Sequence, residues 1–69
     1  MKLSARNVFK GTVKAIEIGA VNVDVSVEIA PEIEVSSIIT KKSSEKLALE
    51  VGKEVFVVIK ASNIMVGVE

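Results

Sequence analysis

Two short runs of the sequence combine a cation with small residues, and they are the residues best suited to chemistry. SARN begins at Ser4 and contains the only arginine, Arg6, while KAS contains Lys60 and ends at Ser62. Small neighbours let backbone N–H groups approach a ligand closely, and the guanidinium and ammonium groups supply positive charge. The two serines add hydroxyl donors. Together these groups could hold a tetrahedral oxyanion, which needs donors in several directions and charge to offset its desolvation.

Each cation also has a plainer interpretation. Arg6 by itself is typical of a surface cation, and the KAS run favours a binding role for it. Lys60 could be a solvated lysine that protects an edge strand from aggregation.

Other kinds of site find little support. Cysteine and histidine are absent, which excludes disulfides and metal sites built on thiolate or imidazole. The carboxylates are scattered with no convergent pair, and no phosphate-binding loop or nucleophile–base pair is present. We therefore expect a protein that is not an enzyme and has neither a cofactor nor a bound metal ion.

The length and the charge of the chain limit the kinds of partner that it can bind. A chain of 69 residues makes one small domain with a thin core, so self-association is expected. Nine basic residues balance nine acidic ones, which removes the positive field that nucleic-acid binding requires. No apolar run resembles a signal peptide or reaches membrane-spanning length. We expect a cytoplasmic protein with no nucleic-acid or membrane partner.

Most of the chain has the pattern of β-strands. Val and Ile, whose branched side chains suit a pleated surface, supply 13 and 8 residues. Strict alternation from Val21 to Ile29 predicts a strand with its valines on one face. Before this strand, the apolar residues fall at odd-numbered positions from Phe9 to Val13 and at even-numbered positions from Ile16. This change of face indicates a β-bulge or a strong bend. Pro31 ends the ladder, and the next strand loses its alternation at Ile38 and Ile39.

The second half of the chain predicts a helix and two strands. Residues 43–52 favour a short helix capped by Ser43 or Ser44, with Leu47 packed inward and a turn at Gly52. Residues 54–61 and 63–68 complete a set of five strands, separated by a break at residues 61–63. The pattern predicts an all-β fold with one short helix, a five-stranded Greek-key barrel of the OB type, in a single domain over residues 1–69. Phe9 and Phe56 are expected in its core.

The motifs SARNVFKGTV, SIIT, SSEKLAL, EVGKEV and VIKASNIMVGV, taken together, resemble a molbindin, the single-domain form of the molybdate-binding module (Mop, TOBE-like). The resemblance extends over essentially the whole chain. It implies an intracellular protein that binds molybdate or tungstate for storage or homeostasis. It also implies a homo-hexamer, a trimer of dimers that share strands, with the anion held between subunits.

The resemblance also implies which residues bind the anion. It places the main site on Ser4, Arg6, Lys60, Ala61 and Ser62, and in related modules on Thr40 and Ser43 as well. With Ala5 and Asn7, which flank Arg6, these residues form the expected oxyanion-binding set. Three of these have structural alternatives: Thr40 as a strand residue, Ser43 as a helix cap and Asn7 as a turn residue.

Two other functions compete with oxyanion binding. A barrel of the OB type could bind single-stranded nucleic acid, but that needs aromatic stacking surfaces beside a basic groove, and the chain has two Phe, no Tyr and no Trp. A purely structural oligomerisation module would account for the valine-rich strands but not for SARN and KAS.

Overall fold

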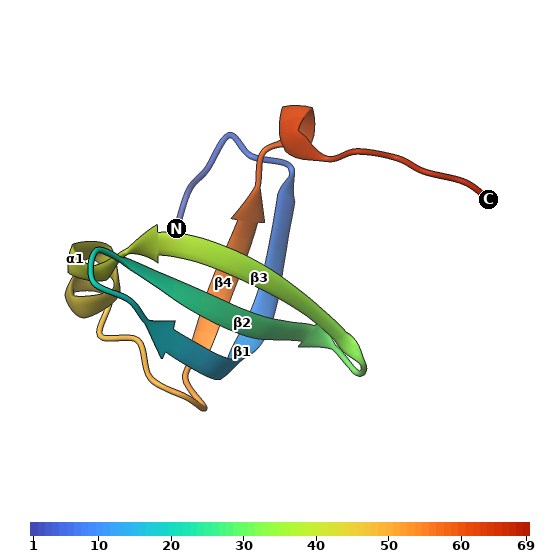
Figure 1. Cartoon of the computed structure of the whole chain (residues 1–69). Coiled ribbons are helices and arrows are strands. Elements are labelled where there is room, and N and C mark those ends of the chain that lie inside the picture. The colour runs from blue at the N-terminus through green and yellow to red at the C-terminus, as the bar shows by residue number, and fades with distance from the viewer.

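The computed structural model describes all 69 residues as one antiparallel sheet with a short helix at its side (Figure 1). The strands lie in the order β3-β2-β1-β4. The elements in chain order are β1 (Asn7–Ile18), β2 (Asn22–Ala30), β3 (Ile33–Thr40), α1 (Lys41–Lys46), β4 (Glu54–Ile59) and the 3-10 turn η1 (Ala61–Asn63). The all-β class with one short helix is therefore confirmed.

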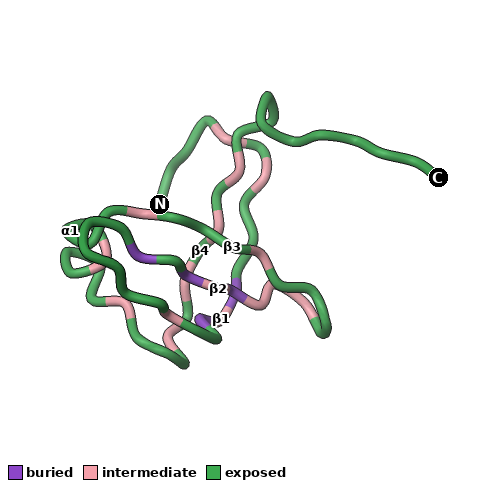
Figure 2. Tube along the Cα trace, viewed as in Figure 1, coloured by how far each residue is buried: buried purple, intermediate pink, exposed green.

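Strand β2 carries the core. Val23, Val25 and Val27 are buried on one face, as the alternation predicts, and Val13 of β1 packs against them. Burial is confined to the middle of the β1–β2 pair, and most of the chain is exposed (Figure 2). The expected thin core is thus observed. Phe9 and Phe56 were wrongly expected in it, since 38% and 54% of their surfaces are exposed.

The two halves of strand β1 pair with different strands. Residues 7–12 pair with β4, and residues 12–18 pair with β2. The register with β2 shifts between Val13 and Ala15, which confirms the predicted bulge. Gly11 allows the change of partner, because a Cβ atom there would lie 2.6 Å from Val27 Cγ1 and 2.7 Å from the Glu28 carbonyl oxygen. The bend in β1 brings β4 round toward the core face of β2.

Strand β3 shows why its alternation breaks. Ile39 pairs with Val23 and packs against the core, whereas Ile38 points to the other face and is 70% exposed. Both edge strands, β3 and β4, have one free edge.

The helix begins and ends earlier than the sequence predicts. It covers residues 41–46, and its N-cap is Thr40, whose Oγ1 accepts a hydrogen bond from Ser43 N. Thr40 is the N-cap because it ends β3 in extended geometry, which an N-cap residue requires. Neither Ser43 nor Ser44 therefore caps the helix. Leu47 is 57% exposed, and Leu49 packs against the core in its place. Gly52 forms the expected turn with φ of 93°.

The predicted fifth strand over residues 63–68 is absent. After η1 the chain runs away from the sheet with no strand pairing, and Met65, Val66 and Val68 are 92–95% exposed (Figure 1). The alternating pattern is that of a strand, but residues 64–68 pair with no strand of the same chain. The sheet therefore has four strands and stays open between β3 and β4, so no closed barrel forms within one chain.

Candidate functional site

The SARN and KAS runs lie side by side at one end of the β1–β4 pair. Asn7 and Ile59 are the last paired residues of that ladder, so Arg6 and Lys60 are the next residues of each strand in register. Figure 1 shows the segment before β1 and the turn after β4 emerging together. Two segments that are far apart in the sequence thus meet because β1 and β4 are antiparallel neighbours.

Several backbone donors in these two segments have no acceptor in the protein. Residues 1–6 take part in no backbone hydrogen bond. In η1, Asn63 N donates to Lys60 O over 2.9 Å and Ile64 N to Ala61 O over 3.3 Å, which leaves the N–H groups of Ala61 and Ser62 free. Unpaired amides next to small side chains are suited to an anion.

The side chains of this cluster are equally unengaged. Arg6 and Lys60 are exposed and form no ion pair, and the hydroxyls of Ser4 and Ser62 form no hydrogen bond. Ala5 and Asn7 are half-buried and anchor the start of β1. Two cations without a carboxylate partner give this end of the sheet a local positive potential. We call residues 4–7 and 60–62 the donor cluster.

Thr40 and Ser43 do not join the donor cluster within the chain. They lie where β3 ends and α1 begins, and β3 is the edge of the sheet opposite to β4. Their side chains bond to each other, because Thr40 Oγ1 donates to Ser43 Oγ over 2.8 Å while accepting from Ser43 N over 3.0 Å. The structure thus divides the predicted site residues into two groups.

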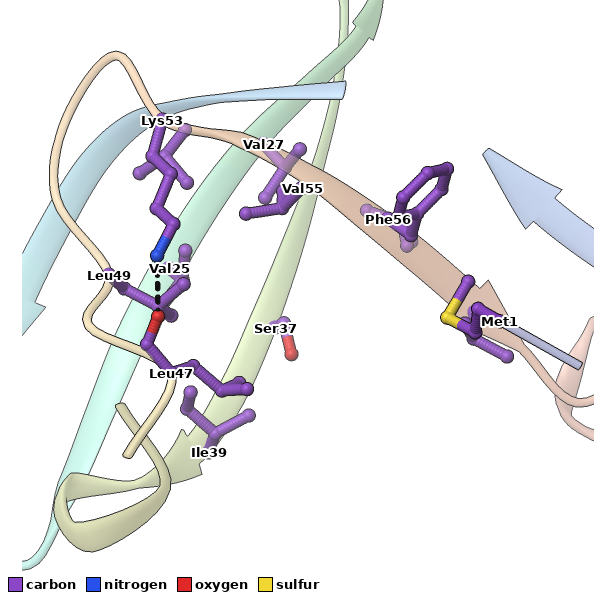
Figure 3. Close-up of a pocket in the computed structure, with 13 residues that line it drawn as sticks. Met1, Val25, Val27, Ser37, Ile39, Leu47, Leu49, Lys53, Val55 and Phe56 are labelled. Carbon is purple, nitrogen blue, oxygen red and sulfur yellow. Dashed lines mark hydrogen bonds between the residues drawn. The ribbon is translucent and has the colours of Figure 1, made fainter. Parts of the chain in front are cut away.

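A larger hollow, the apolar groove, has a volume of about 440 Å³ between the two edge strands (Figure 3). Its walls come from β3, β4 and the loop after α1, and its floor comes from valines of β1 and β2. Ser37 and Lys53 are its only polar residues. Lys53 Nζ donates to the carbonyls of Leu47 and Ala48 over 2.7 and 3.1 Å, which fixes the end of α1.

Sequence reasoning missed the role of Lys53. Its side chain reaches the carbonyls of Leu47 and Ala48 across the loop that follows α1, and no residue pattern in the sequence identifies such a contact. A second hollow lies over β1 and contains Glu28 and Glu54, each in an ion pair with a lysine at 3.8 and 3.4 Å. Its carboxylates make it unsuited to an anion.

Two further observations concern metals and membranes. No group of His, Cys, Asp or Glu residues has the arrangement to hold a metal ion. None of the helices has the length and apolar character needed to cross a bilayer.

An open, thin-cored β sheet with two donor loops at one end defines a small β module suited to binding. A family model for the TOBE domain matches residues 3–66, and the chain belongs to that family. The chain is 48% identical over 69 residues to a probable molybdenum-pterin-binding protein of Haemophilus influenzae, and the match covers all of both chains. It is 44% identical to the molybdenum transport protein ModE of Azotobacter vinelandii, of which it spans 26%.

Solved structures agree with these relatives. The chain superimposes on MopII of Clostridium pasteurianum with a TM-score of 0.91 at 36% identity, covering 97% of this chain and 100% of that one. A second match is the cytoplasmic molybdate-binding protein ModG with molybdate bound, with a TM-score of 0.94 at 45% identity. It covers 100% of this chain and 49% of ModG. These matches confirm the resemblance on which the sequence analysis relied.

Proposed function

We propose that this protein binds molybdate, and tungstate, as intact oxyanions for storage or homeostasis in the cytoplasm. The observation that carries the proposal is the donor cluster, where Arg6 and Lys60 adjoin unpaired backbone amides at one end of the β1–β4 pair. The binding is non-enzymatic and needs no cofactor. The names of the relatives, which include a molybdate-bound structure, support the choice of anion.

The chemistry of the cluster matches a tetrahedral dianion. Its oxygens accept hydrogen bonds in four directions, and the cluster offers amide, hydroxyl, ammonium and guanidinium donors. No side chain needs to coordinate the metal atom itself, which agrees with a sequence that lacks cysteine and histidine. Each charge-assisted bond is roughly twice as strong as a neutral one.

We also propose that the anion site is completed between subunits of a homo-hexamer built as a trimer of dimers. Ile64, Val66 and Val68 have the alternation of a strand, and the sheet is open between β3 and β4, where the apolar groove lies. Residues 64–68 of one chain entering this gap in a second chain would supply the missing fifth strand. Thr40 and Ser43, which lie apart from the donor cluster within one chain, then contribute across subunits.

A pterin is a poorer ligand for this chain, although the names of several relatives include it. The apolar groove offers two polar side chains, and the ammonium of Lys53 already donates to two carbonyls. A bound pterin would leave several of its ring nitrogens and its amide without partners, and each unpaired polar group costs about 1–3 kcal/mol.

Isothermal titration of the purified protein tests the proposal. Molybdate and tungstate should each saturate at a fixed number of anions per hexamer. Sulfate and phosphate at equal concentration should compete weakly, because donors spaced for the larger tetrahedron fit the smaller anions poorly. A single-stranded oligonucleotide should give no heat, as expected without aromatic stacking surfaces. Absence of molybdate binding, or tight binding of the oligonucleotide, would refute the proposed function.

A further inference from the structure

The donor turn and the unpaired tail are consecutive in the chain. Residues 60–63 supply Lys60 and the free amides of η1, and residues 64–69 follow with no intervening linker. Ile64 is both the C-cap of η1 and the first residue of the tail. The direction in which the tail leaves the sheet is therefore set by the same backbone that aims the donors.

This turn is held weakly in the single chain. Its only hydrogen bonds are Asn63 N to Lys60 O at 2.9 Å and Ile64 N to Ala61 O at 3.3 Å, and no side chain caps it. All residues from 60 to 69 are exposed. A turn with so few contacts samples other conformations. When an anion binds this turn, the loss of that conformational entropy lowers the affinity.

The tail needs a partner of apolar character with a free strand edge, and a second copy of this chain offers both. Its apolar groove lies between two open strand edges, and the tail carries Met65, Val66 and Val68 almost fully exposed. Docking of the tail fixes the exit direction of η1 and so orders the donors in advance. Binding that orders a shared segment lowers the cost of the second event.

We infer that η1 couples oxyanion binding to subunit assembly: docking of the tail raises the affinity of the donor turn, and a bound oxyanion strengthens the docking of the tail by the same factor. The inference rests on the proposed function, because it needs an anion at the donor cluster. Reciprocity follows from thermodynamic linkage, and coupling of this kind is typically about 5- to 150-fold. The site thereby regulates how readily subunits exchange.

Subunit exchange measures the coupling without any label on the site. Unlabelled and ¹⁵N-labelled protein are mixed with and without molybdate, and the formation of mixed-isotope oligomers is followed by native mass spectrometry. In the wild type, saturating molybdate should slow exchange at least about fivefold. Two glycines inserted between Asn63 and Ile64 separate the turn from the tail, so the insertion variant should still assemble but lose this effect. Two glycines added after Glu69 form the matched control and should behave as wild type.

Each outcome supports or overturns the coupling. If titration shows molybdate binding but exchange is unchanged in the wild type, the coupling is wrong, and so is the proposed site between subunits, while molybdate binding itself stands. If the insertion variant keeps the slowing, the coupling does not pass through η1 and the inference fails. If that variant remains monomeric, Asn63→Gly, which loosens the turn without lengthening it, takes its place and must reduce the slowing. Absence of molybdate binding in the wild type would instead refute the proposed function.

Discussion

Arg6 and Lys60 are the residues just beyond the last β1–β4 pair, Asn7 with Ile59, so two cations lie at the same end of this ladder. Neither side chain is paired with a carboxylate. Like charges near each other repel, and a dianion bound at this end of the sheet would offset both of them. The placement of two unpaired cations therefore suits an anion-binding site.

Replacement of Lys60 with alanine tests the cation directly. Lys60 is exposed and forms no ion pair or side-chain hydrogen bond, so Lys60→Ala should leave the fold intact. Molybdate affinity should fall about thirtyfold, as expected for loss of a charge-assisted hydrogen bond. Lys10→Ala removes the same charge from the surface pair with Glu54 and is the matched control. Equal affinities for the two variants in isothermal titration would mean that Lys60 is only a surface charge.

Arg6 is expected to act through its charge more than through its shape. No hydrogen bond fixes its guanidinium, so its planar fork is not held in a defined orientation. Arg6→Lys should therefore keep molybdate affinity within about threefold of wild type, while Arg6→Ala should lose about tenfold. Titration of both variants provides the comparison. If Arg6→Lys loses as much affinity as Arg6→Ala, the site recognises the anion through the geometry of the fork.

At the scale of the elements, the sequence pattern predicted the features that depend on neighbouring residues alone. The alternation from Val21 to Ile29 predicted β2 and its buried face, and the change of parity after Val13 predicted the bulge. The helix start was misplaced because Ser43, Ser44 and Thr40 are all competent caps, and only the end of β3 decides between them. The last strand was predicted wrongly, because alternation in residues 64–68 does not show whether a strand is available to pair with them, and within the chain none pairs with them.

The donor cluster was predicted from residue types and from the motif resemblance, and it could not have come from periodicity. That Arg6 and Lys60 are neighbours depends on β1 pairing with β4, which is a property of the whole sheet. The separation of Thr40 from this cluster likewise depends on strand order, which no local pattern contains.

The end of α1 contains a backbone conformation that glycine would adopt more easily. Leu49 N donates to Ser44 O and Ala48 N to Glu45 O, a Schellman arrangement that places Ala48 in the left-handed region with φ of 51°. Ala48→Gly should therefore raise the free energy of unfolding by about 1 kcal/mol. Urea denaturation measures the change. The same substitution at Ala15, in a strand without positive φ, should lower stability, and a loss at both positions would contradict the interpretation.

At the scale of the whole molecule, one chain is an incomplete structure. Four valine side chains form the buried core, while the apolar groove and the tail are left open to solvent. A core of this size gives little net stability once the entropy of ordering 69 residues is subtracted. In the proposed assembly through shared strands a second copy would supply the missing burial, and folding stability is then expected to depend on protein concentration.

Val66 separates assembly from folding, because it is 92% exposed in the single chain. Within that chain, Val66→Glu replaces one solvated side chain with another and should not disturb the fold. If residues 64–68 dock in the apolar groove of a second copy, the same substitution places a charge in an apolar site and should dissociate the oligomer. Size-exclusion chromatography with light scattering should then give a multiple of 7.3 kDa for the wild type and a smaller species for the variant.

Val51→Glu, at a valine that is 65% exposed in the loop before β4, is the matched control and should assemble as wild type. A Val66→Glu variant that assembles normally would show that the tail stays in solvent and that some other surface joins the subunits.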